Sequence, residues 1–93
     1  YYIKKYKDKE RYPFYCDFYI PNEDLFIELN AHWTHGGRPY DPNDEFCQKQ
    51  LKDWQEKAKT SKFYQEAINT WTIRDVKKLE TAKKNNLNYK VIY

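Results

Sequence analysis

One short stretch of this chain limits its possible folds more than any other. Residues 14–20 read FYCDFYI, a run of aromatic and β-favouring residues with proline on both sides, which predicts a β-strand. The PNED sequence that follows is typical of a turn, and LFIEL at 25–29 predicts a second strand. Together they predict a hairpin that carries an acid in the middle of each strand, Asp17 and Glu28.

Side chains alternate between the two faces of a strand, so the hairpin predicts which residues share a face. The first strand is expected to separate Phe14, Cys16, Phe18 and Ile20 from Tyr15, Asp17 and Tyr19. In the second strand, Glu28 is expected on the same face as Phe26 and Asn30.

The segments on either side of the hairpin predict a strand, a loop and a helix. Residues 1–12 predict a further strand, and residues 32–40 (HWTHGGRPY) predict a loop that holds both glycines and both histidines. Asp41 followed by proline is a favoured helix start, and apolar residues recur at helical spacing from there to about residue 59.

The last third of the chain predicts two more helices and a strand. Residues 63–71 form an amphipathic stretch, and Thr72 with Asp75 resembles a capping box, which predicts a new helix to Lys84. Its inward residues are expected to be Ile73, Val76, Leu79 and Ala82. YKVIY at 89–93 predicts a strand, so the fold class is α/β, a small mixed sheet flanked by helices, with the last strand beside the hairpin.

Composition favours one folded domain over residues 1–93. Aromatic residues make up 19% of the chain, which supplies a core and argues against a disordered tail. No apolar run approaches the roughly 20 residues that a bilayer requires, so no membrane partner is expected. Two cysteines are too few for a disulfide scaffold and are not spaced as zinc ligands, which favours a reducing, cytoplasmic location. The lack of methionine suggests a fragment of a longer protein.

The net charge of +3 is distributed unevenly. Residues 13–48 carry −6, whereas the three segments 1–12, 49–62 and 63–93 carry +3 each. Carboxylates that hold a cation between basic arms that hold a polyanion would suit a metal-dependent enzyme acting on phosphodiesters. Ordinary solvated helix faces would give the same distribution, and charge alone leaves that alternative open.

The acid in each strand of the hairpin is the feature that points to chemistry. A carboxylate in an aromatic strand is costly unless it binds something, and two on adjacent strands could share Mg²⁺. The spacing from Asp17 is ten residues, then Glu28, one residue, and Asn30. This resembles the D…(D/E)-x-K core of the restriction-endonuclease-like nucleases, with Asn in place of Lys. Two solvent-facing acids on edge strands are the alternative.

The histidine loop extends this resemblance to the very short patch repair endonucleases. In that branch a strand Asp-Phe is followed by a strand ending in His-Gly, then aromatic residues, then a second His. Aligning its strand Asp with Asp17 places the first His at Asn30 and the second at His35. WTIRDVKKL and the later NYKVIY are similar to the branch's C-terminal block, and its last catalytic Asp falls on Asp75.

Related homing endonucleases share a motif written EDxHD, in which Asp17, His35 and Asp75 would be the D, H and final D. The motif's leading Glu has no counterpart here, and the repair enzymes' zinc-binding cysteines are not matched. The lack of those cysteines favours the homing-endonuclease relatives, which are encoded by phages and mobile elements, over the repair enzymes.

The resemblance implies a metal-dependent endonuclease that cuts double-stranded DNA, with Mg²⁺ or Mn²⁺ as cofactor and a homodimer as a further expectation for the full-length protein. Asp17 would bind the metal with Glu28 or a backbone carbonyl at the end of the second strand. His35 would take a proton from the attacking water, and Asp75 would accept a hydrogen bond from His35 or orient a metal-bound water. Asn30 would contact phosphate or water. The expected nucleic-acid contacts are His32, Arg38, Arg74, Lys77 and Lys78.

Two other functions stay open at this point. One is a nucleic-acid-binding module that has lost catalysis on a nuclease-like fold, and the other is a protein-interaction domain. Individual residues also have structural alternatives: His32 as a packing residue, Asp75 as an acid at a helix start, and Trp33 as core rather than as a wedge against bases.

Overall fold

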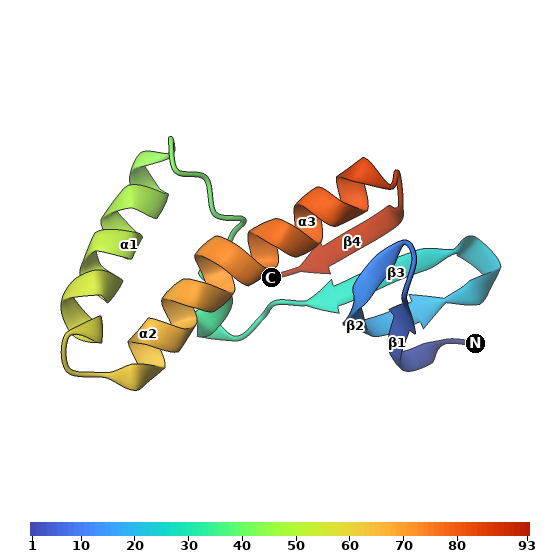
Figure 1. Ribbon diagram of the computed structural model, residues 1–93, viewed down its shortest axis with the longest axis horizontal. Helices are drawn as coiled ribbons and strands as arrows, with labels where there is room; N and C mark the ends of the chain where they lie inside the picture. The colour runs from blue at the N-terminus through green and yellow to red at the C-terminus, as the bar shows by residue number, and fades with distance from the viewer. The chain divides into compact units, whose positions relative to one another are not determined.

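The computed structural model describes residues 1–93, which divide into two compact units. The first unit, Tyr1–Ala31 with Lys77–Tyr93, is built on a four-stranded mixed sheet (Figure 1). Its strands lie in the order β1-β2-β3-β4 and span Ile3–Asp8, Tyr12–Ile20, Leu25–Leu29 and Asn88–Ile92. The first three strands pair antiparallel, and β4 pairs parallel with β3. The α/β class, the hairpin and the position of the last strand are confirmed.

One face of this sheet forms the core of the first unit. The helix α3 (Asp75–Lys84), which belongs to this unit from Lys77 onward, contributes the buried Ala82. The buried sheet residues packed with it are Tyr12, Cys16, Tyr19 and Phe26. Most of these side chains are aromatic, as the composition predicted, and Tyr6 and Tyr19 stack with ring centroids 3.9 Å apart.

The predicted alternation of side chains in the first hairpin strand is wrong at one point. Cys16 and Tyr19 are both buried in the core although they are three residues apart, and Ile3 and Tyr6 in β1, also three residues apart, are both half-buried against the same core. Between Ile3 and Tyr6, Lys5 has a φ of +55°, a left-handed backbone conformation that residues other than Gly rarely adopt. In both strands the side chains that point to the core therefore shift by one residue at this kink. The kink is at Lys5 in β1 and at the opposite residue, Asp17, in β2.

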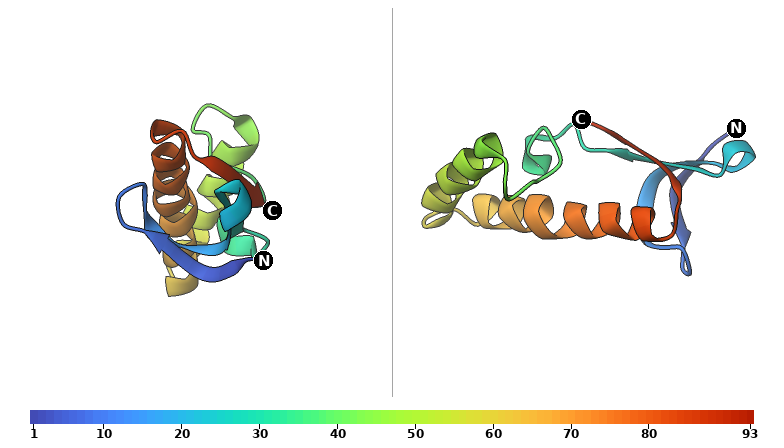
Figure 2. Two further views of the ribbon diagram at one scale, coloured as in Figure 1. Left: turned by 90° about the vertical axis from the view of Figure 1, so that its right-hand side faces the viewer. Right: turned by 90° about the horizontal axis from the view of Figure 1, so that it is seen from above.

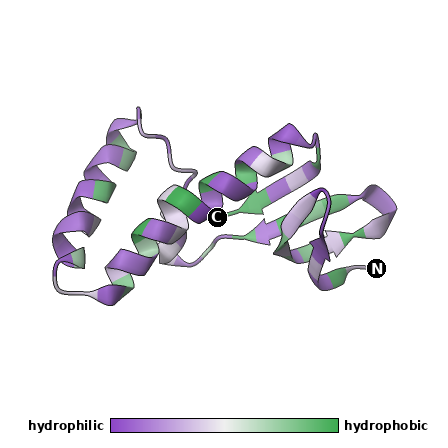
Figure 3. Ribbon diagram, viewed as in Figure 1, coloured by the Kyte–Doolittle hydropathy of each residue, from purple (hydrophilic) through white to green (hydrophobic).

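The second unit, His32–Val76, packs two helices around tryptophan. The helices α1 (Glu45–Ala58) and α2 (Lys62–Asn69) lie side by side, and Figure 2 shows the short turn that joins them. A 3₁₀ turn, η2 (Trp33–His35), precedes them. The core consists of Cys47, Trp54, Ala67 and Trp71. In α1 only a narrow stripe is apolar, and Figure 3 shows most of that helix as hydrophilic.

Two predicted helix starts are wrong. The N-cap of α1 is Asp44, whose carboxylate accepts the Cys47 N–H at 3.0 Å, whereas Asp41 accepts the Asn43 N–H and forms a turn before it. No new helix begins at Thr72, because the chain continues from α2 into α3 through a π-helical turn, η3 (Thr70–Arg74). The Thr72 hydroxyl donates to the Ile68 carbonyl instead of capping.

The π turn also explains why Ile73 was assigned to the wrong face. A π turn adds a residue to the helix and rotates the side chains that follow, and Ile73 is 59% exposed. Ala82 is buried, and Val76 and Leu79 are half-buried. None of the helices combines the length and the apolar composition that a membrane span requires.

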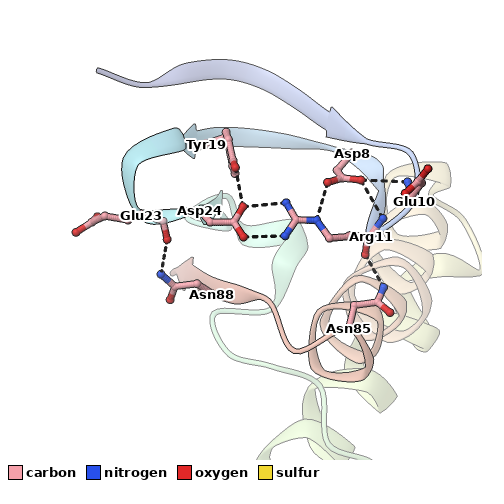
Figure 4. Close-up of polar contacts among 8 residues, drawn as sticks. All are labelled: Asp8, Glu10, Arg11, Tyr19, Glu23, Asp24, Asn85 and Asn88. Atoms are coloured by element: carbon pink, nitrogen blue, oxygen red, sulfur yellow. Dashed lines mark hydrogen bonds and ion pairs between the residues drawn. The ribbon is translucent and has the colours of Figure 1, made fainter.

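A single arginine connects the two turns of the sheet (Figure 4). The Arg11 guanidinium donates to both oxygens of Asp24, at 2.7 and 2.8 Å, and its Nε donates to Asp8 at 2.7 Å. The bonds from Arg11 and then from the Tyr19 hydroxyl lower the pKa of Asp24 to about 2. The Asp8 pKa is lowered as well, first by the backbone N–H of Arg11 and then by its side chain. Donation to Asp24 raises the pKa of Tyr19 to about 12. The β1–β2 and β2–β3 turns are therefore held together by charge.

Replacing Arg11 should make the stability less dependent on pH in acid. A carboxylate whose folded pKa is lowered stabilises the fold above its unfolded value, and this contribution is lost as pH falls through the folded pKa. The stability difference between wild type and Arg11→Gln should therefore be constant from pH 7 to about 4 and shrink between about 4 and 2. Urea unfolding at each pH measures it, with Arg74→Gln as control. A difference that stayed constant down to pH 2 would contradict the assignment.

Candidate functional site

The first group of predicted site residues lies where β2 and β3 separate. The last paired residues before the separation are Phe18 and Ile27. Beyond them, the Asp17 N–H donates to Glu28 Oε1 at 3.1 Å and the Leu29 N–H donates to Asp17 Oδ2 at 2.8 Å. The two carboxylates thus accept backbone N–H groups that a continued β-ladder would have paired. The structure brings Asp17 and Glu28 together, as predicted, although through backbone bonds.

Glu28 is a buried, fully bonded carboxylate. It is 2% exposed, and its Oε2 accepts bonds from the Tyr12 hydroxyl and from Lys78 Nζ, the latter at 3.1 Å. The Tyr12 and Tyr89 hydroxyls lie 3.0 Å apart. Burial raises the pKa of Tyr12, and the bond to Glu28 raises it further, so this phenol stays protonated as a donor. Lys78 therefore compensates a charge that would otherwise be costly to bury.

The same charge affects the neighbouring thiol. Burial, followed by the Glu28 carboxylate, raises the pKa of Cys16 to about 11. Its Sγ donates to the carbonyls of Phe18 and Ile27 at 3.1 and 3.2 Å. A protonated, buried thiol of this kind is a packing residue and neither a nucleophile nor a metal ligand.

The two acids do not fit equally well as ligands of Mg²⁺. Both oxygens of Glu28 already accept hydrogen bonds, and the Lys78 ammonium lies 3.1 Å from Oε2. Asp17 uses only Oδ2, and Oδ1 forms no hydrogen bond within the chain. Mg²⁺ is commonly held by one or two carboxylates with several waters, so Asp17 fits as a single ligand. No group of three or more His, Cys, Asp or Glu side chains is arranged to hold a metal ion.

Removing the positive charge beside Glu28 should destabilise the fold strongly. Lys78→Met leaves a buried carboxylate without its cation, which we expect to cost about 3 kcal/mol in the free energy of unfolding at pH 7. The double variant Lys78→Met/Glu28→Gln should recover part of the loss, because no net charge is then buried. Urea denaturation measures both, with the exposed Lys77→Met as matched control. Equal stabilities for the Lys77 and Lys78 variants would refute this role.

The second group of predicted residues lies in the second unit. His35 ends the 3₁₀ turn η2, and its Nδ1 lies 2.7 Å from Oδ2 of Asp75, forty residues later in the chain. The side chains are 22% and 10% exposed, so water screens the contact only partly. An ionised carboxylate can only accept, so Nδ1 carries the proton, and Nε2 of the neutral ring keeps its lone pair. The predicted hydrogen bond between His35 and Asp75 is present.

Glycine and tryptophan hold His35 in place. Gly36 caps η2 with a φ of +75°, and a Cβ there would lie 2.3 Å from the indole of Trp71. Trp71 is fully buried, and its Nε1 donates to the Arg38 carbonyl at 2.8 Å. The Gln50 amide donates to the Gly36 carbonyl at 3.0 Å. The loop on both sides of Gly36 is therefore fixed to two helical segments, which leaves His35 little freedom.

The two glycines make a matched pair for testing this packing. Gly36→Ala brings a methyl group against Trp71 and also strains a positive φ, so we expect a loss of about 3 kcal/mol in unfolding free energy. Gly37 has a similar φ of +74° but nothing within 4 Å of a Cβ, so Gly37→Ala should cost only about 1 kcal/mol. Thermal and urea unfolding measure both variants. Equal losses would show that Trp71 does not constrain Gly36.

The other predicted contact residues have different surroundings. Asn30 is 8% exposed, and its N–H donates to the Ile92 carbonyl at 2.6 Å. His32 is exposed, and its Nδ1 caps η2 beside Thr34. The Arg38 guanidinium lies 3.7 Å from the Phe46 ring centroid and 3.8 Å from Asp44.

Arg74 and Lys77 are exposed, as a surface that contacts DNA requires. Lys78 differs from them, because it is engaged with Glu28 rather than facing solvent freely. Sequence reasoning missed Tyr12, which donates to Glu28, and Tyr89, whose hydroxyl lies beside that of Tyr12, because these residues lie far apart in the chain and no spacing connects them.

Comparisons of the chain with protein-family models, curated proteins and solved structures find no match. Its function is therefore inferred from the residues and contacts described above.

Proposed function

We propose that this chain is a DNA endonuclease domain with a restriction-endonuclease-like core, similar to the homing-endonuclease relatives of very short patch repair enzymes. The observation that carries the proposal is the contact between His35 and Asp75. These residues are forty positions apart, and the motif resemblance pairs them independently of any structural contact. The mixed sheet and its helices agree with the α/β class that such a core would have.

His35 is the proposed general base. With the Nδ1 proton held by Asp75, Nε2 presents a lone pair that can accept a proton from water attacking a phosphodiester. Asp75 is a positioning residue, because it orients the ring and stabilises the imidazolium that forms. The packing of Gly36 against Trp71 fixes the turn that carries His35 and so helps to keep its ring beside Asp75.

Asp17 is the proposed protein ligand for Mg²⁺, which when bound would polarise a phosphate and stabilise charge on the leaving oxygen. Glu28 is assigned a different role, since its oxygens are bonded to Tyr12, Lys78 and the Asp17 amide. It holds the Asp17 backbone in place and so acts as a positioning residue. The proposed substrate is double-stranded DNA.

One observation favours a second candidate, a DNA-binding module without catalysis. Lys78 compensates the charge of Glu28, so the acid pair is stable without a metal, and Asn30 is neutral where the nuclease core has Lys. This candidate predicts salt-dependent DNA binding with no cleavage at any concentration of Mg²⁺ or Mn²⁺.

Nicking of supercoiled plasmid in Mg²⁺ separates the two candidates. His35→Gln should lower the nicking rate by about 10²- to 10⁴-fold, as expected for loss of a general base. Asp75→Asn should lower it by about 10- to 100-fold, because the ring loses its orienting acceptor. Asp17→Ala should abolish the response to Mg²⁺, and Asp41→Asn, in an exposed turn, is the control. Undiminished nicking by both the Asp17 and the His35 variants would refute the endonuclease assignment.

A further inference from the structure

The strand β1 carries a row of lysines to which the proposed mechanism gives no role. Lys4, Lys5 and Lys7 lie in the strand, and Lys9 lies in the turn after it. All four are exposed, and none of them takes part in an ion pair. Because β1 is the edge strand of the sheet, no further strand covers its outer side.

Two of the acids close to this row are bound by an arginine and not by the lysines. Asp8 and Asp24 are both bound by the Arg11 guanidinium and do not pair with the lysines. Figure 4 shows these carboxylates directed at Arg11. Residues 1–12 carry five cationic side chains against Asp8 and Glu10, so the strand and its turn keep a net charge of +3.

The kink in β1 exposes two successive lysines close to Asp17. Lys4 and Lys5 are both exposed, whereas successive residues of a regular strand point to opposite faces. The left-handed φ of Lys5 makes this possible, at a conformational cost that Gly or Asn would lower. The register of β1 and β2 puts Lys5 across from Asp17, the proposed metal ligand.

Aromatic side chains accompany the lysines. Tyr15 on β2 is 64% exposed, and Lys7 Nζ lies 5.2 Å from the centroid of its ring. Tyr1 and Tyr2, which precede the strand, are 88% and 56% exposed. Cations with exposed rings nearby are the combination that binds phosphates together with unpaired bases.

We propose that β1 is the DNA-backbone binding surface of this domain, with Lys4, Lys5 and Lys7 on successive phosphates and Lys5 holding one beside Asp17. This assignment rests on the proposed function for its substrate. It favours DNA over an acidic protein or a membrane because the charges form a single row along an extended strand, among rings that can stack on bases.

The test measures binding without cleavage. The variant Lys4→Gln/Lys5→Asn/Lys7→Gln removes three charges, and Asn suits the positive φ at position 5. The control variant, Lys49→Gln/Lys52→Gln/Lys62→Gln, removes three exposed lysines that form no ion pair. Fluorescence anisotropy in EDTA gives the affinity for a labelled duplex and for one of its strands, between about 50 and 200 mM salt.

If all three lysines contact phosphate, the slope of log affinity against log salt should fall by about 2.7 on the duplex and about 2 on the single strand. The control should lose less than about 1. The relative affinities show whether duplex or single strand is the better ligand. EDTA prevents metal-dependent cleavage, so the binding measurement tests the β1 surface even if the domain does not nick plasmid. Nicking without lysine-dependent binding would contradict the β1 surface and leave the endonuclease proposal in place.

Three outcomes would overturn the proposal. Equal losses in both variants would mean that overall charge alone governs binding. An unchanged slope together with self-association of the β1 variant in light scattering would mean that the lysines only prevent pairing of sheet edges. Lysine-dependent binding to phosphatidylserine vesicles with no binding to DNA would identify a membrane surface instead.

Discussion

The packing of the Trp71 indole against Gly36 is the contact on which the candidate catalytic pair depends. Trp71 is fully buried among Tyr40 and Trp54, and a Cβ at Gly36 would clash with its indole. His35 precedes that position directly, so the orientation of its ring follows from an apolar contact. The hydrogen bond to Asp75 then selects the tautomer. A polar pair on the surface would not be ordered to this degree, because holding exposed side chains in one geometry costs entropy.

The first unit buries an acid, Glu28, within an aromatic sheet. Glu28 lies where β2 and β3 separate, and its oxygens replace the missing ladder bonds while Lys78 and Tyr12 compensate its charge. This arrangement explains why an acid is tolerated there without a metal. Asp17, on the neighbouring strand, keeps an oxygen that no group in the chain occupies. The two carboxylates thus have different surroundings, although their positions in the sequence suggested a shared role.

The parts of this structure that sequence could predict are those controlled by local pattern. The hairpin follows from its proline-bounded strands, and β4 beside β3 follows from a last strand that needs a partner. The helix starts were missed because Asp41 and Asp44 are chemically equivalent caps three residues apart, and a π turn has no clear sequence signal. The pairing of Lys78 with Glu28 depends on tertiary packing over fifty residues, which no spacing encodes. The contact between His35 and Asp75 was predicted only through a motif resemblance.

The protonation state of the His35 ring tests the proposed chemistry most directly, because the proton transfer requires a free Nε2. Long-range ¹H–¹⁵N correlation spectra of the imidazole distinguish the two neutral tautomers, and a spectrum of His35→Gln assigns the signals. We predict a protonated Nδ1 and an unprotonated Nε2 for His35, and a change in this ring alone in Asp75→Asn. A ring protonated on Nε2, or one unaffected by Asp75→Asn, would contradict the assignment of His35 as a base oriented by Asp75.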